Sequence, residues 1–238
     1  MKKIVALSGS PRSGQPKQRS FTEKILDLFI EGMNPAEYRK HHLHRLKINY
    51  CRGCMNCWFK TPGQCVIKDD MTAFLKTEIE EADAIIWASP VYIDGFSAQI
   101  KTVLDRCFAF LDPFITLDDE GHCRHKRFKP RKQAAVLIAT CGFSERDNFD
   151  HMRRHFDAFC RNFAWRNAGA VLVPASALGF AGDGLYDDKY KVVTAAGREF
   201  AEDGSISTVT MQMISNEVMG AEEYADNVNK FFAKLRKQ

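Results

Sequence analysis

Four cysteines stand close together in the first third of the chain, with the spacing C-x2-C-x2-C-x7-C: Cys51, Cys54, Cys57 and Cys65. Thiolates are soft ligands, and four of them this close together form the ligand set typical of a [4Fe–4S] cluster. Structural zinc sites usually place two C-x2-C pairs further apart, so zinc fits this spacing less well. The alternative is a loop that the thiols only help to pack. We expect a [4Fe–4S] cluster on residues 51–65.

A second polar group comprises Ser10, Arg12, Ser20 and Thr22, after the short apolar run at residues 4–7. Such a run is too short for a buried helix and suits a buried strand. Helical spacing of apolar residues follows, at Phe21, Ile25, Leu28 and Phe29. A helix N-terminus attracts anions, and hydroxyl groups with an arginine suit a phosphate. The sequence therefore predicts a phosphate-binding loop, the alternative being a polar connection before a capped helix.

The type of phosphate follows from the motifs that are missing. The chain has no G-x-x-x-x-G-K-[ST] and no G-x-G-x-x-G, so the Walker and dinucleotide fingerprints are excluded. A loop rich in hydroxyl groups suits a terminal phosphate such as that of FMN, which open parallel sheets hold at the switch point beside the first strand.

Two further segments follow buried strands, at residues 89–96 and 140–144. The carboxyl ends of parallel strands share one edge of the sheet, where ligands bind. Pro90, Tyr92 and Phe96 offer a rigid backbone and aromatic faces, which suit a flat heterocycle such as isoalloxazine. Taken alone, the segment also fits a proline-containing turn with a surface tyrosine.

The elements that must position these groups alternate along the chain. Strands are expected at 4–7, 37–46, 84–88, 134–139 and 170–174, and helices from 21 and at 69–82, 97–111, 148–162, 189–202, 207–214 and 221–237. This alternation predicts an α/β fold, a doubly wound parallel five-stranded sheet of order 2-1-3-4-5. We divide the chain into a binding domain, residues 1–175, with the cysteine loop 51–65 and an insertion at 112–131, and a helical C-terminal extension of the same domain at 176–238.

Composition narrows the function classes. The 238 residues are 45% apolar and 27% charged, with a net charge of +4 and a pI of about 8.6. This mildly basic balance counts against an acidic electron carrier and does not require nucleic acid. The N-terminus lacks the apolar stretch of a signal peptide, so we expect a cytoplasmic protein whose other cysteines, Cys107, Cys123, Cys141 and Cys160, are free thiols.

Two weaker patterns are interpreted as solvated surface. His151 and His155 stand four apart but lack the glutamate of H-E-x-x-H. The basic run at 122–132 is most simply a solvated loop, with contact to the phosphates of a nicotinamide nucleotide as the alternative.

Four segments together resemble a known family. They are GSPR at 9–12, the cysteine segment leading through TPGQC to KDDM, ASPVY at 88–92 and ATCGF at 139–143. The chain resembles the flavodoxin-like NADPH-dependent FMN reductase superfamily over roughly residues 3–174, and the cysteine spacing resembles its iron–sulfur flavoprotein branch. The first loop departs from the pattern, because residues 15–19 look inserted.

The resemblance implies an FMN site. The phosphate would be held by Ser10, Arg12, Ser20, Phe21 and Thr22. The flavin ring would be lined by Pro90, Val91, Tyr92, Ile93, Thr140 and Gly142. It also implies a homodimer or homotetramer.

The expected function is an FMN-dependent NAD(P)H oxidoreductase that passes electrons to an unidentified acceptor, with the [4Fe–4S] cluster as a further carrier. The flavin does this chemistry, so no catalytic acid–base dyad is expected. The alternatives are a flavodoxin-type electron-transfer protein without enzymatic activity and, with only the basic stretches behind it, a zinc-stabilised module that binds nucleic acid.

Overall fold

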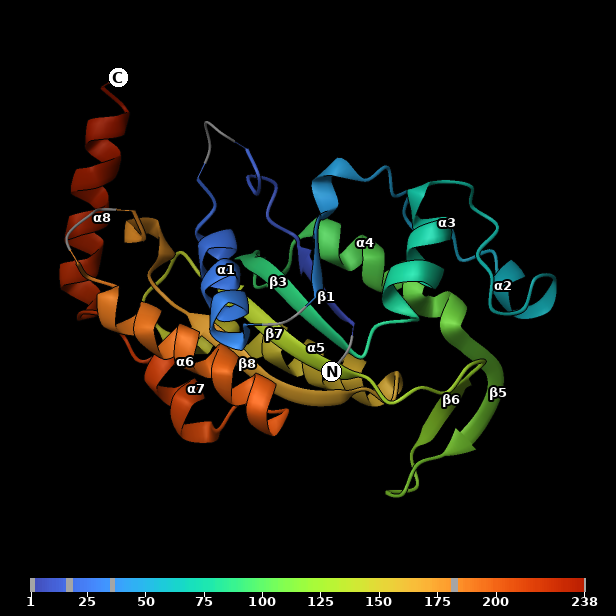
Figure 1. Ribbon diagram of the computed structural model, residues 1–238. Coiled ribbons are helices and arrows are strands. Elements are labelled where there is room, and N and C mark those ends of the chain that lie inside the picture. Colours follow the sequence, from blue (N-terminus) through green and yellow to red (C-terminus); the bar gives the residue numbers. More distant parts are fainter. Residues whose placement is uncertain (1–2, 16–18, 35–36, 181–183, 238) are drawn as a thin grey trace.

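Five parallel strands form the centre of the molecule. A computed structural model describes residues 3–15, 19–34, 37–180 and 184–237. The strands lie in the order β2 (Tyr38–His42), β1 (Ile4–Ser8), β3 (Ala84–Tyr92), β7 (Ala134–Thr140) and β8 (Arg166–Val173) (Figure 1). This confirms the predicted order 2-1-3-4-5, with the basic strand β2 at an edge.

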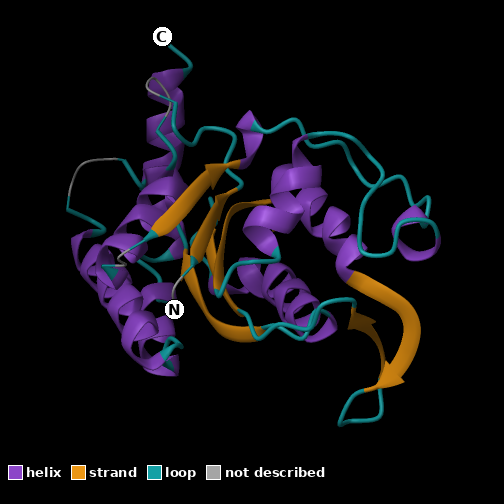
Figure 2. Ribbon diagram, turned by 45° about the vertical axis from the view of Figure 1, so that its right-hand side comes forward, coloured by secondary structure: helices purple, strands orange, loops and turns teal. Residues whose placement is uncertain are grey.

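Helices cover both faces of the sheet (Figure 2). One layer contains α1 (Phe21–Met33), α6 (Asp187–Asp203) and α7 (Thr208–Ser215); the other contains α3 (Asp70–Phe74), the π-helix Leu75–Ile79, α4 (Ala98–Arg106) and α5 (Asp150–Asn162). Successive residues of β1 alternate between the two cores: Ile4 and Ala6 face one, Val5 and Leu7 the other. A strand buried on both faces explains the unbroken apolar runs in the sequence.

Helix α6 crosses α1 at very short range because both helices have glycine at the contact. A Cβ atom added to Gly32 would lie 1.8 Å from the Thr194 carbonyl oxygen, and one added to Gly197 would lie 2.0 Å from that of Phe29. The segment assigned to a C-terminal extension therefore contributes one of the helices that cover the sheet. Beyond it, α7 packs on β8, and α8 (Ala221–Leu235) follows.

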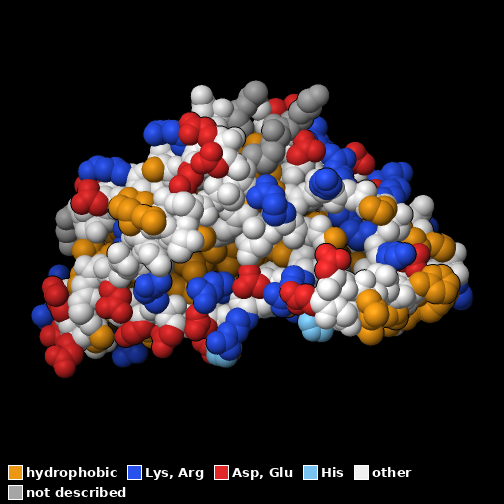
Figure 3. Space-filling model, turned by 90° about the horizontal axis from the view of Figure 1, so that it is seen from below, with side chains coloured by type: hydrophobic (Ala, Val, Ile, Leu, Met, Phe, Trp, Pro, Cys, Tyr) orange, Lys and Arg blue, Asp and Glu red, His pale blue; other side chains and the backbone are white. Residues whose placement is uncertain are grey.

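The charged insertion forms a β-hairpin that the sequence did not predict. It consists of β5 (Leu111–Leu117) and β6 (Cys123–Arg127), after the 3-10 helix η3 (Cys107–Phe110). Hydrophobic side chains gather on the right of Figure 3, the side on which Figure 1 places this hairpin and α2 (Asn56–Phe59). The exposed apolar residues of β5 are Phe114, Ile115 and Leu117.

Three cations of the basic run, Arg124, Lys129 and Arg131, are paired with acids. Arg124 lies 3.1 Å from Asp118, and Lys129 lies 3.0 Å from Glu80. Because these charges are already compensated, the hairpin gives little support to the interpretation as a nicotinamide phosphate site.

Several element boundaries differ from those expected. Strand β3 continues to Tyr92 and pairs with β4 (Gly95–Phe96), so the second predicted loop is a hairpin. Strand β2 is shorter than 37–46, because the chain turns into the 3-10 helix η1 (Leu43–Arg45). Two further 3-10 helices in the described part of the chain are η4 (Arg146–Phe149) and η5 (Ser176–Leu178). Among the described residues, none of the helices has the length and apolar character needed to cross a membrane.

Candidate functional site

The first candidate loop leads from β1 into α1 and gathers hydroxyl groups at the helix start. The Ser20 side chain caps α1 by accepting a hydrogen bond from the Glu23 amide, 3.2 Å away. The Ser13 hydroxyl is hydrogen-bonded to that of Ser8 and lies 3.4 Å from that of Ser20. Ser10 is buried beside them. Helix N-termini leave amide groups unpaired, so this cluster has the chemistry of a phosphate site.

Gly14 is anchored at both of its backbone polar groups, which holds this loop in place. Its amide donates to the Glu23 carboxylate at 2.7 Å, and the Arg45 guanidinium donates to its carbonyl oxygen. Gly14 has a φ of 64°, a left-handed conformation that glycine adopts at little cost.

A hydrogen bond joins the first and third candidate loops. The Thr22 and Thr140 hydroxyls lie 2.7 Å apart, and both side chains are buried. The start of α1 and the end of β7 therefore meet at one point of the sheet edge, as the sequence predicted.

The second candidate segment presents Tyr92 and Ile93 to solvent. Val91 pairs with Phe96 and Tyr92 with Gly95, so Ile93 and Asp94 form the turn. Both turn residues have positive φ, 46° and 59°, as two-residue hairpin turns of type I′ require. A β-branched residue rarely adopts this conformation. Ile93 is also 97% exposed, and strained backbone positions are more frequent at functional sites than elsewhere.

The third candidate loop is tied to the C-terminal part of the chain. The amide of Ser176 donates to the Cys141 carbonyl oxygen at 2.8 Å, and the Tyr224 hydroxyl of α8 donates to that of Gly142. A Cβ atom added to Gly142 would meet nothing within 4 Å, so open space adjoins this position. Phe143 beside it is 65% exposed.

The structure thus brings Ser10, Ser20, Phe21, Thr22 and Thr140 together in or beside the hydroxyl cluster. Pro90 is buried in the sheet, while Tyr92, Ile93 and Gly142 are exposed at its edge; Val91 is half-buried. Arg12 is exposed. The sequence left open which of Arg12, Ser13 and Ser20 reaches the phosphate, and the Ser13 hydroxyl lies in this cluster. Ser8, whose hydroxyl belongs to the same cluster, and Phe143 were not among the predicted site residues. The recurrence of serine at 8, 10 and 13 is the pattern in the sequence that indicates them.

The cysteine loop is closed at its neck by a buried ion pair. Arg106, 1% exposed, donates to the Asp69 carboxylate at 2.7 and 3.1 Å. It also donates to the carbonyl oxygens of Asn49, before the loop, and Ile67, after it. The Asn49 amide donates to Asp69 as well, at 2.9 Å. One guanidinium group therefore joins both ends of the loop.

The four thiols of the loop are free and interact electrostatically. Burial, followed by the neighbouring Cys65, Cys51 and Cys54, raises the pKa of Cys57 to about 11. The negative charge of a Cys65 thiolate is also among the causes that raise the pKa of Arg106. Across the described ranges, no three His, Cys, Asp or Glu side chains are arranged to hold a metal ion. The four thiols fit a thiolate-bound cluster in their chemistry.

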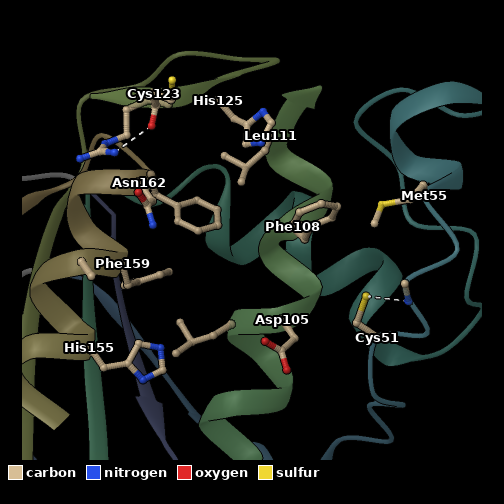
Figure 4. Close-up of a pocket in the computed structure, with 15 residues that line it drawn as sticks. Cys51, Met55, Asp105, Phe108, Leu111, Cys123, His125, His155, Phe159 and Asn162 are labelled. Atoms are coloured by element: carbon tan, nitrogen blue, oxygen red, sulfur yellow. Dashed lines mark hydrogen bonds between the residues drawn. The ribbon is translucent and has the colours of Figure 1, made fainter. Parts of the chain in front are cut away.

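A cavity of about 650 Å³ lies between the cysteine loop, α4 with η3, the β5–β6 hairpin and α5. Figure 4 shows Phe159 and Asn162 of α5 on one side of Phe108, and Cys51 and Met55 on the other. Its wall is largely apolar, and it is distinct from the hydroxyl cluster at the sheet edge.

Comparison with known proteins finds an FMN reductase family model and several iron–sulfur flavoproteins among the curated relatives. A family model described as NADPH-dependent FMN reductase matches residues 2–178. An iron–sulfur flavoprotein of Archaeoglobus fulgidus is 41% identical over 110 residues, 45% of this chain and 46% of that protein. One of Methanosarcina thermophila is 33% identical over 106 residues, 44% of this chain and 51% of that protein. The chain thus spans about half the length of the curated relatives it matches.

Solved structures share the fold at low identity. An NAD(P)H:quinone oxidoreductase from Methanothermobacter marburgensis has a TM-score of 0.60 and 17% identity, covering 84% of this chain and 96% of that one. An FMN-dependent NADH-azoreductase from Bacillus anthracis has a TM-score of 0.61 and 14% identity, covering 85% and 100%. These likenesses support the flavodoxin-like architecture, and the match over residues 2–178 shows that the chain belongs to the NADPH-dependent FMN reductase family.

Proposed function

We propose that this protein is an FMN-dependent oxidoreductase that takes electrons from NAD(P)H. The observation that carries the proposal is the hydroxyl cluster at the start of α1, joined to the third loop by the hydrogen bond between Thr22 and Thr140. The cluster would hold the FMN phosphate, and Tyr92, Ile93 and Gly142 would border the ring. Bound FMN would accept hydride from the nicotinamide ring and pass electrons on. The protein's own residues bind and orient it.

Two measurements test this proposal. Protein reconstituted with FMN should show flavin absorbance, and stopped-flow mixing with NADPH or NADH should bleach it. A flavodoxin-type carrier would bind FMN but leave it oxidised after mixing. Failure to bind FMN at high concentration would refute the whole proposal.

We also propose that Cys51, Cys54, Cys57 and Cys65 ligate a [4Fe–4S] cluster. Their spacing and the closed neck of the loop support it; such a cluster carries single electrons. Anaerobic reconstitution should yield iron and sulfide with an EPR signal after reduction. Replacing Cys54 and Cys57 by serine should abolish iron binding, whereas serine at the separate thiol Cys160 should not.

We infer further that the protein self-associates, as a homodimer or homotetramer, in the cytoplasm. Phe231, Phe232 and Leu235 of α8 are 39–49% exposed, and β5 adds three exposed apolar side chains. Free cysteines throughout the described chain are compatible with a reducing compartment. Light scattering that reports a monomer at micromolar concentration would refute self-association. The paired charges of the basic run give no support to nucleic-acid binding.

A further inference from the structure

The loop between β1 and α1 is held from two different elements at Gly14. The Glu23 carboxylate of α1 accepts from the Gly14 amide at 2.7 Å. The Arg45 guanidinium of η1, 31 residues further along the chain, donates to the Gly14 carbonyl oxygen. Glu23, Gly14 and Arg45 are called the loop anchor below. Gly14 directly precedes residues 15–19, which look inserted relative to the family pattern, so the anchor separates the hydroxyl cluster from this longer segment.

The backbone at Gly14 fits this anchor closely. Its φ of 64° lies in the left-handed region, which glycine adopts without strain. A Cβ atom added there would lie 2.7 Å from Nη2 of Arg45 and 2.9 Å from Nε2 of His42. A larger residue would therefore displace the Arg45 guanidinium from its contact with the loop.

The loop anchor also fixes the hydroxyl cluster, because Ser13 is the residue before Gly14. The Ser13 amide donates to the Ser10 carbonyl oxygen at 3.2 Å, and its hydroxyl lies 3.4 Å from that of Ser20. Ser20 in turn caps α1 through the amide of Glu23. Glu23 thus contacts the cluster through its backbone and the anchor through its side chain, so Gly14 cannot move without disturbing the cluster.

The carboxylate of the anchor is compensated by strand β2. Glu23 lies 3.2 Å from the Lys40 ammonium and 3.5 Å from Nδ1 of His42. Burial lowers the pKa of His42, so this imidazole is neutral at pH 7 and Lys40 supplies the positive charge. Lys40 also pairs with Asp27, one turn further along α1, at 2.8 Å. Because Glu23 has this counter-charge, it does not cancel the attraction of the helix N-terminus for an anion.

We propose that Glu23 and Arg45 are positioning residues for a phosphate group at this loop and set the preference of the protein for FMN over riboflavin. The inference rests on the proposed function, which places the FMN phosphate at the hydroxyl cluster. Ordering a loop during binding costs affinity, and a loop that is held beforehand avoids this cost. Riboflavin has no phosphate, so its binding does not depend on the loop.

The test measures the dissociation constants of FMN and riboflavin for the flavin-free full chain by isothermal titration calorimetry. Glu23→Ala removes the acceptor of the Gly14 amide. A hydrogen bond to a charged group is worth about tenfold in affinity or more, so the Kd for FMN should rise by about that factor. The Kd for riboflavin should stay unchanged. Glu23→Gln keeps an oxygen that can accept from the Gly14 amide and should restore most of the FMN affinity.

Two matched controls separate the anchor from charge alone. Asp27→Ala removes the other acid partner of Lys40, and Asp27 forms no hydrogen bond to the described part of the loop; its FMN affinity should equal that of the wild type. Arg45→Met should raise the Kd for FMN several-fold. Lys47→Met removes an equally charged, exposed side chain two residues away and should have no such effect.

Hydrogen–deuterium exchange of the flavin-free protein gives a readout that needs no ligand. Residues 10–15 should exchange faster in Glu23→Ala than in the wild type, and at the wild-type rate in Asp27→Ala. Three results would overturn the inference: equal losses of FMN and riboflavin affinity in Glu23→Ala, FMN binding that is unchanged or tighter in that variant, or unchanged exchange. Wild-type protein that binds no FMN would instead refute the proposed function, and the exchange measurement would still test the anchor.

Discussion

Replacing Arg106 should both destabilise the protein and open the cysteine loop. Its side chain is fully buried and the side chain of Asp69 is 3% exposed, so Arg106→Met would leave a buried carboxylate without its counter-charge. Breaking a buried pair in this way costs about 3–5 kcal/mol of the free energy of unfolding. Urea titration measures this loss, provided that the slope of unfolding free energy against denaturant is unchanged.

Asp69, the other member of the ion pair, has two roles: it carries the charge that pairs with Arg106, and it caps a helix. Asp69 also caps α3 by accepting from the Met71 amide at 3.1 Å. Asp69→Asn keeps an oxygen for this cap, but it leaves the guanidinium charge of Arg106 buried without its counter-charge, so it should also cost about 3–5 kcal/mol. The double variant has no unpaired charge, so its loss should be smaller than the sum of the single losses by about 1–3 kcal/mol.

Arg127 provides the matched control. It is buried to 7% exposure, but it donates to the neutral side chain of Gln133 at 2.7 Å. Arg127→Met therefore leaves no buried anion and should cost less than Arg106→Met. If the two losses are equal, the ion pair is not the cause of the effect.

Hydrogen–deuterium exchange in the cysteine loop gives a second test of the role of Arg106. Since Arg106 joins Asn49 to Ile67 and Asp69, its loss should speed hydrogen–deuterium exchange in residues 50–66 under native conditions. Arg106→Lys should give an intermediate result, because one ammonium group cannot reproduce a planar fork with several acceptors. Exchange that rises equally in Arg127→Met would show general destabilisation and refute the role of Arg106 at the neck.

Further predictions concern the start of α1, the β3–β4 hairpin and the C-terminal helices. Ser20→Ala should cost about 1 kcal/mol of stability and weaken FMN binding, whereas Ser207→Ala, which removes the cap of α7, should cost the same without affecting FMN. Ile93→Gly should raise the melting temperature by relieving a strained φ, yet weaken FMN binding if this side chain borders the ring. Burial lowers the pKa of Lys189 to about 8; the unfolded chain then holds more protons between pH 8 and 10.5, so unfolding free energy should rise with pH there relative to Lys189→Met. If unfolding free energy depends on pH in the same way in the wild type and in Lys189→Met, the lowered pKa of Lys189 is refuted.

The sequence predicted those parts of the fold that depend on local pattern. Strand order followed from alternating apolar runs and helical segments, and Ser20, Asp69 and Ser97 cap helices where the chain suggested helix starts. The convergence of Thr22 and Thr140 followed from the geometry of parallel sheets. These inferences needed only neighbours in sequence and the rule that parallel strands share a carboxyl edge.

Other features depend on contacts between distant segments, which no local pattern reveals. The close crossing of α1 and α6 needs glycines 165 residues apart, at 32 and 197. The turn at Ile93 and Asp94 lacks the Asn-Gly pair that marks such turns. The β5–β6 hairpin has a strand reading CRHKR, with few strand-forming residues, and Arg127 at the end of this strand lies over the Phe110 ring of η3, 5.7 Å from the ring centroid.

Helix α4 connects the two candidate sites. At its start, Ser97 donates its amide to the Ser89 hydroxyl at 3.0 Å, beside the β3–β4 hairpin. At its end, Arg106 closes the neck of the cysteine loop. Nine helical residues span about 14 Å, and the apolar face of α4 is buried through Ile100 and Val103. A short, buried helix is stiff, so the hairpin that would border the flavin and the loop that would carry the cluster are held at a fixed separation within one chain.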